Sequence, residues 1–343
     1  MSVALPLEPQ TRLLIVTVNY RTADLVIQSL RSLQTEIQSV PGTKVAIVDN
    51  NSGDGSAGKI AAAIAAEGWG DWAILMPSSV NGGFAYGNNY AIRPALQTPQ
   101  PPDYFLLLNP DAQVRPGALK ALVDFLDQHP EAGIAGSSFE EQNGKLWPYA
   151  FHFPGIISEF ENGLRLGVVS KLLARWKVVN VMDQDREQPI DWLPGASMMI
   201  RRQVFEAVGL MDEGYFLYYE ETDFCLQAQR AGWSCWYVPQ SRVMHILGQS
   251  TGVTAKNQAP KRLPQYWYDS RRRYFMKNYG WFYTAIADIS WLVGFGLWRV
   301  RRAIQRKPDG DPPKMLWDSL RNSVFFKPNV PAQELPSPQQ ATH

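Results

Sequence analysis

Short apolar runs alternate with helical segments through the first 138 residues of this 343-residue chain. Runs such as Lys44–Asp49 and Tyr104–Leu108 are followed by segments with helical spacing, here Ser56–Glu67 and Pro116–His129. Strict alternation of strand and helix is typical of a parallel sheet with helices packed on its faces. The sequence therefore predicts an α/β fold with a central, mostly parallel sheet flanked by helices.

The second part of the chain has a weaker pattern. Residues 140–189 have poor periodicity, and we expect an irregular or mobile segment there that shapes an acceptor pocket. Regular structure resumes with a strand over residues 192–201, a helix to Val208, a helix from about Glu221 to Ala231, and two short strands. We expect this half of the sheet to be antiparallel or mixed.

Composition limits the class of protein and its partners. Apolar residues make up 45% of the chain, which is enough for a sizeable core. The 33 basic and 32 acidic residues nearly cancel, so there is no general attraction to nucleic acid. Cys225 and Cys235 are the only cysteines, which disfavours a disulfide framework and fits a reducing compartment. The apolar stretch Leu13–Val18 is too short for an export signal, so we expect a cytoplasmic protein.

Two acids, Asp49 and Asp111, follow apolar runs that read as buried parallel strands. Ligands of open α/β sheets bind outside the carboxyl ends of the strands, so both acids are expected to face one crevice. Thr17 and Asn19 close the first strand and, with Asp49 and Asn51, are candidates to contact a nucleobase and ribose. A carboxylate can accept the imide N–H of uracil or thymine. Alternatively, Asp49 belongs to a turn that caps the next helix.

A glycine-rich turn, Asn81-Gly82-Gly83-Phe84, lies just past the third strand and opens a helix. Glycines permit close backbone approach, and free N–H groups at a helix start suit an anion. The turn is therefore a candidate diphosphate site. The alternative is that both glycines only satisfy backbone geometry.

Asn109-Pro110-Asp111 presents oxygen ligands suited to a hard cation such as Mg²⁺ or Mn²⁺. A single carboxylate would hold the cation loosely, so the remaining ligands would be diphosphate oxygens and water. His245 is a candidate for the same metal shell. The alternatives are an ordinary Asn-Pro-Asp turn and a structural histidine.

Three acids, Glu220, Glu221 and Asp223, lie at the start of a helix that ends at Gly232. Acids in a first helical turn are expected from the helix dipole, so at least one has a structural role. If a sugar is transferred by direct displacement, one carboxylate must take the proton of the acceptor hydroxyl. The three residues are therefore candidate catalytic bases.

Taken together, these segments resemble a family 2 glycosyltransferase of the GT-A type, and more narrowly its bacterial rhamnosyltransferase-like branch, which builds surface polysaccharides. The resemblance covers about residues 12–280. It rests on seven blocks in the same order, namely Val16–Tyr20, Val48–Ser56, Asn81–Phe84, Leu107–Asp111, Pro194–Ala196 with Met198–Arg202, Val208–Glu213, and Tyr219–Leu226 through Ala231–Trp233.

The resemblance implies roles for the donor side of the site. Asp49 would contact the base, and residues 81–84 would border the donor. Asp111 would bind the metal at the family's degenerate Asp-x-Asp position, joined by His245.

The resemblance also implies which residue is the base. The family's usual Glu-Asp pair falls on Glu220 and Glu221, so the implied base is Glu221. This chain departs from the pattern, because the glutamate side chain is one methylene longer than aspartate and catalytic geometry is sensitive at the ångström scale. Glu220 and Asp223 remain alternative candidates.

The implied fold is a GT-A nucleotide-diphospho-sugar transferase domain over residues 12–280. Residues 12–138 would form its nucleotide-binding half and residues 190–250 its acceptor and base half. The implied reaction is inverting transfer of a sugar from a dTDP- or UDP-sugar, with dTDP-rhamnose as the best candidate, to a glycan or lipid-linked hydroxyl. A Rossmann dehydrogenase is disfavoured because no Gly-x-Gly-x-x-Gly follows the first strand. A non-catalytic sugar-nucleotide-binding or scaffold protein with this fold remains an alternative.

Aromatic and apolar residues fill segment 281–298, and arginine clusters lie at 271–273 and 299–302. Aromatics beside cations suit a membrane interface, whereas Asp288 disfavours a spanning helix. We therefore predict an amphipathic membrane-associating helix over 281–307, attracted to anionic lipid on the inner face of the cytoplasmic membrane. The alternative is a helix packed on the catalytic domain. Residues 308–343 are rich in Pro, Gln and Asp and are predicted to be mostly disordered.

Overall fold

A computed structural model of the chain describes residues 11–147, 149–245 and 260–330. The strands are β1 (Leu13–Asn19), β2 (Thr43–Asp49), β3 (Ala73–Pro77), β4 (Tyr104–Leu108), β5 (Ala112–Val114), β6 (Ala132–Glu140), β7 (Tyr149–Phe151), β8 (Val179–Val181), β9 (Gln188–Ile190), β10 (Ser197–Arg201) and β11 (Ser234–His245). The α-helices are α1 (Ala23–Ser39), α2 (Ser56–Ala66), α3 (Gly83–Leu96), α4 (Ala118–Gln128), α5 (Ile156–Leu164), α6 (Gly167–Leu172), α7 (Arg202–Val208), α8 (Glu220–Arg230), α9 (Gln265–Ile304) and α10 (Met315–Arg321). A short 3₁₀ helix covers Ala174–Trp176.

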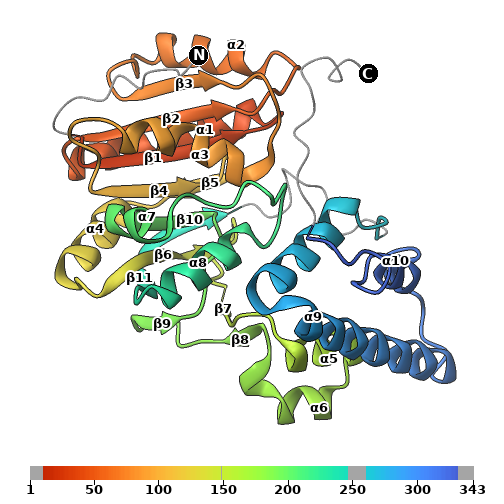
Figure 1. The fold of residues 1–343 in the computed structure, drawn as a ribbon. Helices are drawn as coiled ribbons and strands as arrows, with labels where there is room; N and C mark the ends of the chain where they lie inside the picture. Colours follow the sequence, from red (N-terminus) through yellow and green to blue (C-terminus); the bar gives the residue numbers. More distant parts are fainter. Residues whose placement is uncertain (1–10, 148, 246–259, 331–343) are drawn as a thin grey trace.

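The first half of the main sheet is parallel. β1 pairs in parallel with both β2 and β4, and β2 pairs in parallel with β3. In this register Asn19 lies directly beside Asp49. The carboxyl ends of β1, β2 and β4 therefore meet at one edge of the sheet, as the strand–helix alternation predicts (Figure 1).

The second half of the sheet is mixed, as expected. Within the described residues the nine strands follow the order β3-β2-β1-β4-β10-β6-β11-β5, with β9 paired to β11. β10 runs antiparallel to β4 and places Ser197 beside Leu108, so β10 begins at the edge where β4 ends. The two short strands expected near residues 234–246 form a single strand, β11, whose register against β6 shifts between Val238 and Arg242.

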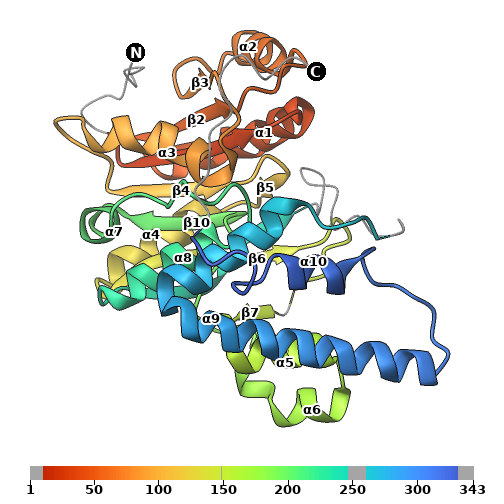
Figure 2. The same cartoon turned by 45° about the vertical axis from the view of Figure 1, so that its right-hand side comes forward.

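Helices cover both faces of the sheet (Figures 1 and 2). Side chains alternate along the strands between these faces and build two cores. On one face, Leu13 and Ile15 of β1 pack in a cluster with Leu30 of α1 and Leu122 of α4. On the other face, strand residues that include Leu14 and Val16 of β1 pack with side chains of α3, α7 and α8. This period of two is the pattern expected for a sheet buried on both sides.

The segment 140–189 differs from the irregular or mobile stretch that we expected. It contains β7 and β8, which pair antiparallel, the helices α5 and α6, and β9, which joins the main sheet. These elements are three to nine residues long, too short for helical or strand periodicity to register. Their structure depends on partners distant in sequence, which local patterns do not report.

Helix α9 is longer than the predicted segment 281–307, because it begins at Gln265. Gly280 interrupts its regular geometry with φ 79° and ψ 177°, values that glycine adopts readily. The second half of the helix packs against α5 so closely that a Cβ on Gly163 would lie 2.7 Å from the carbonyl oxygen of Trp291. None of the helices in the described residues combines the length and the apolar character needed to cross a bilayer.

The tail after residue 308 is more ordered than we predicted. Helix α10 follows α9, and Asp318 on it is buried in a two-point ion pair with Arg262, whose Nε and Nη2 donate to the carboxylate at 2.7 Å. Val324 is also buried. The amino-acid composition of the tail predicted disorder, because composition gives no information on a few specific contacts such as those of Asp318 and Val324. Residues 331–343 lie outside the described part of the chain.

Candidate active site

The sequence-predicted donor residues lie where β1 and β2 end. The Nδ2 of Asn19 donates to Oδ1 of Asp49 at 2.6 Å and to Oγ of Ser52 at 3.1 Å. The Ser52 hydroxyl donates to the same Asp49 oxygen at 2.6 Å, and the Ser52 N–H donates to Oδ2 at 3.3 Å. These contacts fix Asp49 in a local turn at the strand end. Asp49 does not cap α2, because the N–H of Ser56 donates to Asp54 instead.

Two further donor candidates are constrained by the backbone. Asn51 has a φ of 54°, in the left-handed region that asparagine tolerates better than most residues. Its N–H donates to the carbonyl oxygen of Asp49 at 2.8 Å, which closes the turn. Thr17 is buried in β1, and its hydroxyl has no hydrogen-bond partner among the described residues.

Asn50 connects this turn to the glycine-rich turn before α3. Its Nδ2 donates to Oδ1 of Asn81 at 2.9 Å and to the carbonyl oxygen of Gly83 at 3.0 Å. Gly83 has a φ of 83°, and a Cβ placed there would lie 1.8 Å from the carbonyl oxygen of Phe216. Only glycine fits this position, for reasons of both conformation and space.

The backbone donors at the start of α3 differ from the free anion site that we expected. The N–H of Gly83 donates to Oδ1 of Asn81 at 3.1 Å, and the N–H of Phe84 donates to the Phe216 carbonyl oxygen at 3.0 Å. Both donors are therefore used within the protein. A Cβ on Gly82 would lie 2.3 Å from Cγ of Tyr86, so this glycine serves close packing.

Asp111 and His245 come together from β4 and β11. Asp111 lies in the turn after β4, and His245 ends β11 and pairs with Ala112 in β5. Oδ1 of Asp111 lies 3.3 Å from Nε2 of His245 but is buried without a hydrogen bond in the described structure. A buried carboxylate oxygen suits Mn²⁺ or Mg²⁺, and an imidazole nitrogen beside it favours Mn²⁺ of the two, so the residues fit a metal. Larger groups of metal-ligating side chains are absent from the described residues.

The loop before β10 links the metal side of the site to the acidic helix. Its Ala196 carbonyl oxygen accepts the N–H of Asn109 at 3.1 Å. The N–H of the preceding Gly195 donates to Oε1 of Glu221 at 3.3 Å. A Cβ on Gly195 would lie 2.6 Å from Cζ of Phe84, so the Phe84 ring packs directly against this loop.

Glu221 has the surroundings of a base. It is partly buried at the start of α8, and burial raises its pKa above the ordinary value of 4.5, while the Gly195 N–H opposes that shift. A raised pKa brings a carboxylate closer to the range in which it accepts protons efficiently.

The other two acids of this helix have different surroundings. Glu220 is buried, and its pKa is raised well above the ordinary value, first by burial and then by the charge of Glu221. Asp223 is buried in an ion pair with Lys277 at 2.6 Å and also accepts the Nδ2 of Asn278 at 2.7 Å. These contacts join α8 to α9 and occupy the Asp223 carboxylate, so Asp223 has a structural role.

The backbone before α8 is strained. Tyr218 and Tyr219 have φ values of 72° and 69°, which bulky residues rarely adopt. The Tyr219 ring lies 5.3 Å from that of Tyr274 in α9, and the hydroxyl of Ser270 donates to the Leu217 carbonyl oxygen at 2.9 Å. Helix α9 therefore holds the turn that precedes the three acids of α8. Strained backbone of this kind is often found at functional sites.

Three residues that organise the site were not among our candidates: Asn50, Ser52 and Phe216. Asn50 and Ser52 lie inside the motif that includes Asp49, so their polar type and position at a strand end were usable signals. No local signal identifies Phe216, because it acts through its backbone carbonyl on Gly83, far away in the sequence.

The chain is similar to known proteins over much of its length. The model of the family described as Glycosyl transferase family 2 matches residues 13–209. The chain is 31% identical over 188 residues to the N-acetylglucosaminyl-diphospho-decaprenol L-rhamnosyltransferase of Mycobacterium tuberculosis (strain CDC 1551 / Oshkosh), covering 52% of this chain and 60% of that protein. It is 27% identical over 165 residues to a rhamnosyltransferase of Escherichia coli (strain K12), covering 48% of this chain and 60% of the relative.

A solved structure shares the fold. The mannosyltransferase from Pyrobaculum calidifontis in complex with GDP-Man and Mn²⁺ superposes with a TM-score of 0.53 at 15% identity. The superposition covers 94% of this chain and 83% of that one. At this identity the similarity shows the fold alone, and the two curated relatives match over about three fifths of their length.

Proposed function

This chain belongs to glycosyl transferase family 2, and we propose that it transfers a sugar from a nucleotide diphosphate donor to an acceptor hydroxyl with inversion. The observation that carries the proposal is the contact of Glu221 with Gly195, in the loop that also binds the end of β4 beside Asp111. This loop joins a candidate base to a candidate metal ligand. The turn at Asp49 lies at the same sheet edge.

We propose a rhamnosyl donor, with dTDP-rhamnose as the best candidate, and a glycan or lipid-linked acceptor of cell-surface polysaccharide synthesis. The names of the two curated relatives support rhamnose, and one of these names includes an acceptor linked through a diphosphate to a polyprenol. In this proposal the Asp49 carboxylate, held at the end of β2 by Asn19 and Ser52, would accept the imide N–H of a uracil or thymine base.

In the proposed step, the Glu221 carboxylate removes the proton of the acceptor hydroxyl. The acceptor oxygen attacks the anomeric carbon and forms the new glycosidic bond. The bond between this carbon and the phosphate oxygen breaks, and the nucleoside diphosphate leaves with the electron pair. Attack opposite the leaving group inverts the anomeric carbon. Because burial raises the pKa of Glu221, the group is a stronger base than an exposed glutamate.

Asp111 and His245 would hold a divalent cation, Mg²⁺ or Mn²⁺. When bound, such a cation offsets the negative charge of the departing diphosphate. Two protein ligands leave most coordination positions to diphosphate oxygens and water. The proposal therefore expects metal and donor to bind with mutual dependence.

A donor screen tests the proposal. The full chain is incubated with dTDP-rhamnose, UDP-GlcNAc and GDP-mannose, each with and without Mn²⁺, and unfolding temperature is recorded together with transfer to a lipid-linked N-acetylglucosaminyl diphosphate. We expect stabilisation by dTDP-rhamnose that requires Mn²⁺, and transfer that chelation abolishes. Asp111→Asn should remove the metal dependence of donor binding, whereas Asp124→Asn on the exposed face of α4 should leave it unchanged.

Three results would contradict parts of the proposal. Donor binding by wild type that is indifferent to Mn²⁺ would reject the metal assignment. Stabilisation by another nucleotide sugar alone would reject the rhamnosyl donor. Donor binding without transfer to any lipid-linked or glycan acceptor would favour a non-catalytic sugar-nucleotide-binding protein.

A further inference from the structure

The second half of α9 exposes a continuous line of large apolar side chains. They recur every three or four residues, which places them on one side of the helix. Each is between 49% and 81% exposed, and we call them the α9 stripe: Phe282, Ile286, Ile289, Val293, Leu297, Val300 and Ile304.

The opposite side of the same helix is buried. Ala287, Trp291 and Phe295 face the protein, and the backbone of Gly294 lies against α5. The helix is therefore apolar on both sides, and packing within the described chain explains only one of them. From the rise of an α-helix the stripe is about 33 Å long. Monomeric soluble proteins rarely leave so extended an apolar surface uncovered.

Aromatic side chains extend the stripe toward α10. The ring of Trp281 lies 5.3 Å from that of Phe282 and 5.9 Å from that of Phe325. The next residue, Phe326, is 65% exposed. Trp317 on α10 is also exposed and lines the same cavity as Phe326.

The segment that carries the stripe and α10 has a net positive charge. Residues 281–330 contain eight basic and four acidic residues, against a net charge of +1 for the whole chain. All four acids are neutralised by ion pairs, Asp288 with Arg271, Asp309 with Arg299 and Arg302, Asp311 with Arg165, and Asp318 with Arg262. Five exposed cations form no ion pair within the described residues, namely Arg306, Lys307, Lys314, Arg321 and Lys327.

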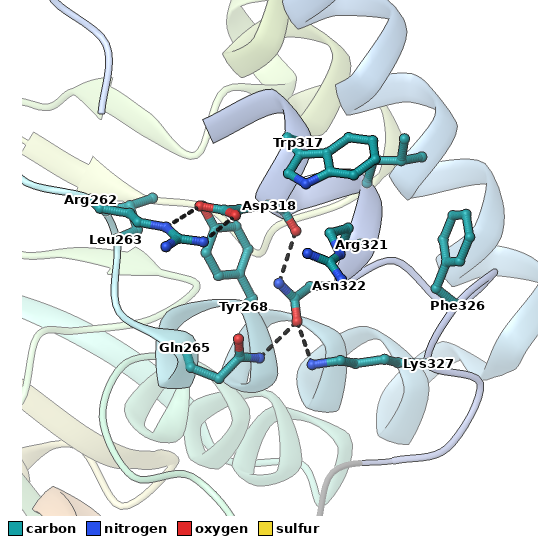
Figure 3. A pocket seen from close by; sticks show the side chains of 11 residues that line it. Arg262, Leu263, Gln265, Tyr268, Trp317, Asp318, Arg321, Asn322, Phe326 and Lys327 are labelled. Carbon is teal, nitrogen blue, oxygen red and sulfur yellow. Dashed lines mark hydrogen bonds and ion pairs between the residues drawn. The ribbon is translucent and has the colours of Figure 1, made fainter. Parts of the chain in front are cut away.

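A cavity of about 790 Å³ lies between the start of α9 and α10, and both cationic and aromatic side chains line it (Figure 3). Arg321 and Lys327 line it, together with the aromatic rings of Trp317 and Phe326. Lys327 donates to Oδ1 of Asn322 at 2.6 Å, and the Arg321 guanidinium lies 5.6 Å from the centre of the Trp317 ring. The cavity shares no lining residue with the candidate active site.

We propose that this face of the protein docks onto an anionic lipid membrane. Helix α9 lies in the plane of the interface after Gly280, with the α9 stripe buried between headgroups and acyl chains. The exposed cations meet lipid phosphates, and Arg321 and Lys327 receive a headgroup phosphate at the mouth of the cavity. Apolar burial and attraction to anionic lipid together give stable, reversible binding.

Charge favours a membrane over a second copy of the chain on this face. A two-fold dimer would bring the same patch of both subunits together and therefore place like-charged cations opposite one another. An anionic lipid surface complements the same cations.

Sedimentation of the full chain with vesicles tests the proposal. The vesicles are phosphatidylcholine alone or phosphatidylcholine mixed with phosphatidylglycerol. We expect binding to the anionic vesicles that weakens as salt rises, and much weaker binding to the neutral ones. The double variant Ile289→Glu/Val293→Glu should weaken binding about tenfold or more. Arg321→Gln/Lys327→Gln should remove much of the preference for anionic vesicles.

A matched control separates the stripe from a general effect of charge. Ala62→Glu/Ala65→Glu adds the same two negative charges at exposed positions of α2 and should bind vesicles as wild type does. Circular dichroism and thermal unfolding establish that each variant is folded. The proposal is overturned if wild type does not bind anionic vesicles, or if the folded stripe variant binds them as well as wild type. Light scattering that shows a dimer lost in the stripe variant would instead assign the face to self-association.

Discussion

At the scale of single residues, the two neighbouring glutamates of α8 differ in what their surroundings allow. Glu221 accepts the Gly195 N–H and is partly exposed, and both features favour its ionised form relative to that of Glu220. Glu220 is buried, its Oε2 lacks a hydrogen bond in the described structure, and its pKa is raised further. Burial without a hydrogen bond therefore disfavours the ionised form of Glu220 more than that of Glu221. We therefore keep Glu221 as the proposed base.

We expect Glu221→Gln to lower kcat by about 10²-fold or more while the donor Kd stays near that of wild type, because only proton removal is lost. In wild type, kcat/KM should fall as the pH decreases through the raised pKa of Glu221. The acid limb should lie above the ordinary glutamate value of 4.5. Measurement of kcat/KM against pH, with donor binding by calorimetry, checks both expectations.

Glu220→Gln serves as the control for this prediction. The amide resembles the neutral form of the buried acid, so we expect this variant to keep most of the activity of wild type. The opposite result, with Glu220→Gln inactive and Glu221→Gln active, would move the base to Glu220.

Gly83 gives a second prediction at this scale. Its φ of 83° disfavours a side chain, and a Cβ would collide with the Phe216 carbonyl at 1.8 Å. We expect Gly83→Ala to destabilise the fold by about 3 kcal/mol or more and to weaken donor binding. Gly117 has nearly the same φ, 84°, but a Cβ at this position would have no neighbouring atom within 4 Å. Gly117→Ala should therefore cost only about 1 kcal/mol. Equal losses in the free energy of unfolding for Gly83→Ala and Gly117→Ala, measured in urea, would refute the predicted collision at Gly83.

At the scale of elements, how far the sequence predicts the structure depends on how local each signal is. The parallel strands β1, β2 and β4 follow from runs of apolar residues between helical segments. Most of the candidate residues for nucleotide-sugar and metal binding follow these strands. Parallel strands end at the same edge of the sheet, so strand direction alone places these residues together. By contrast, the short elements of residues 140–189 pair with segments distant in sequence. A local pattern of apolar residues covers only one of the two partners, so it does not predict the pairing.

The site repeats this contrast. Asp111 and His245 are predicted by residue type and position at strand ends, and the structure brings them within 3.3 Å. The expected anion site at Gly83 was plausible by type, but Phe216 and Asn81 occupy two of its donors. Asp223 is a candidate base by residue type, and its ion pair with Lys277 of α9 joins segments too distant for the sequence to report.

Helix α9 positions the acidic helix through Lys277. Its ammonium group pairs with Asp223 at 2.6 Å and Asp212 at 2.8 Å. Asp223 is buried, so Lys277→Met leaves it without a charged partner, although Asn278 still donates to it. We expect a loss of about 3 kcal/mol in the free energy of unfolding, and a fall in kcat larger than the change in donor Kd.

Lys120→Met is the matched control for that variant. Lys120 pairs with Asp124 on the exposed side of α4, where a surface ion pair contributes little. We expect its free energy of unfolding to stay within about 0.5 kcal/mol of wild type. Equal free energies of unfolding in urea for Lys277→Met and Lys120→Met would show that the ion pair between α8 and α9 does not stabilise the fold.

At the scale of the whole molecule, α9 connects the candidate active site to the face that we propose docks on a membrane. Its first half lies beside α8 (Figure 2) and contacts the strained turn. Its second half carries the α9 stripe. A third apolar cluster, which includes Tyr215, Leu226 and Phe275, lies between these parts. Docking on a membrane would therefore orient the acidic side of the site relative to the lipid surface. This arrangement suits an acceptor that is itself anchored in lipid.

The same arrangement predicts that the catalytic domain does not end at residue 280. Asp288 accepts from Arg271 at 2.5 Å and from the N–H of Val324 at 2.9 Å, while Arg271 also holds the buried Glu159. A chain that ends after residue 280 loses both bonds of Asp288 and the packing of Trp291 on α5, and it leaves Arg271 with Glu159 alone. We expect its unfolding temperature to fall by about 10 °C or more, with loss of a cooperative transition. A chain that ends after residue 330 keeps all of these contacts and should unfold as wild type does in the same calorimetric scan. Equal unfolding temperatures for the two truncations would show that residues 281–330 are an appendage rather than part of the folded domain.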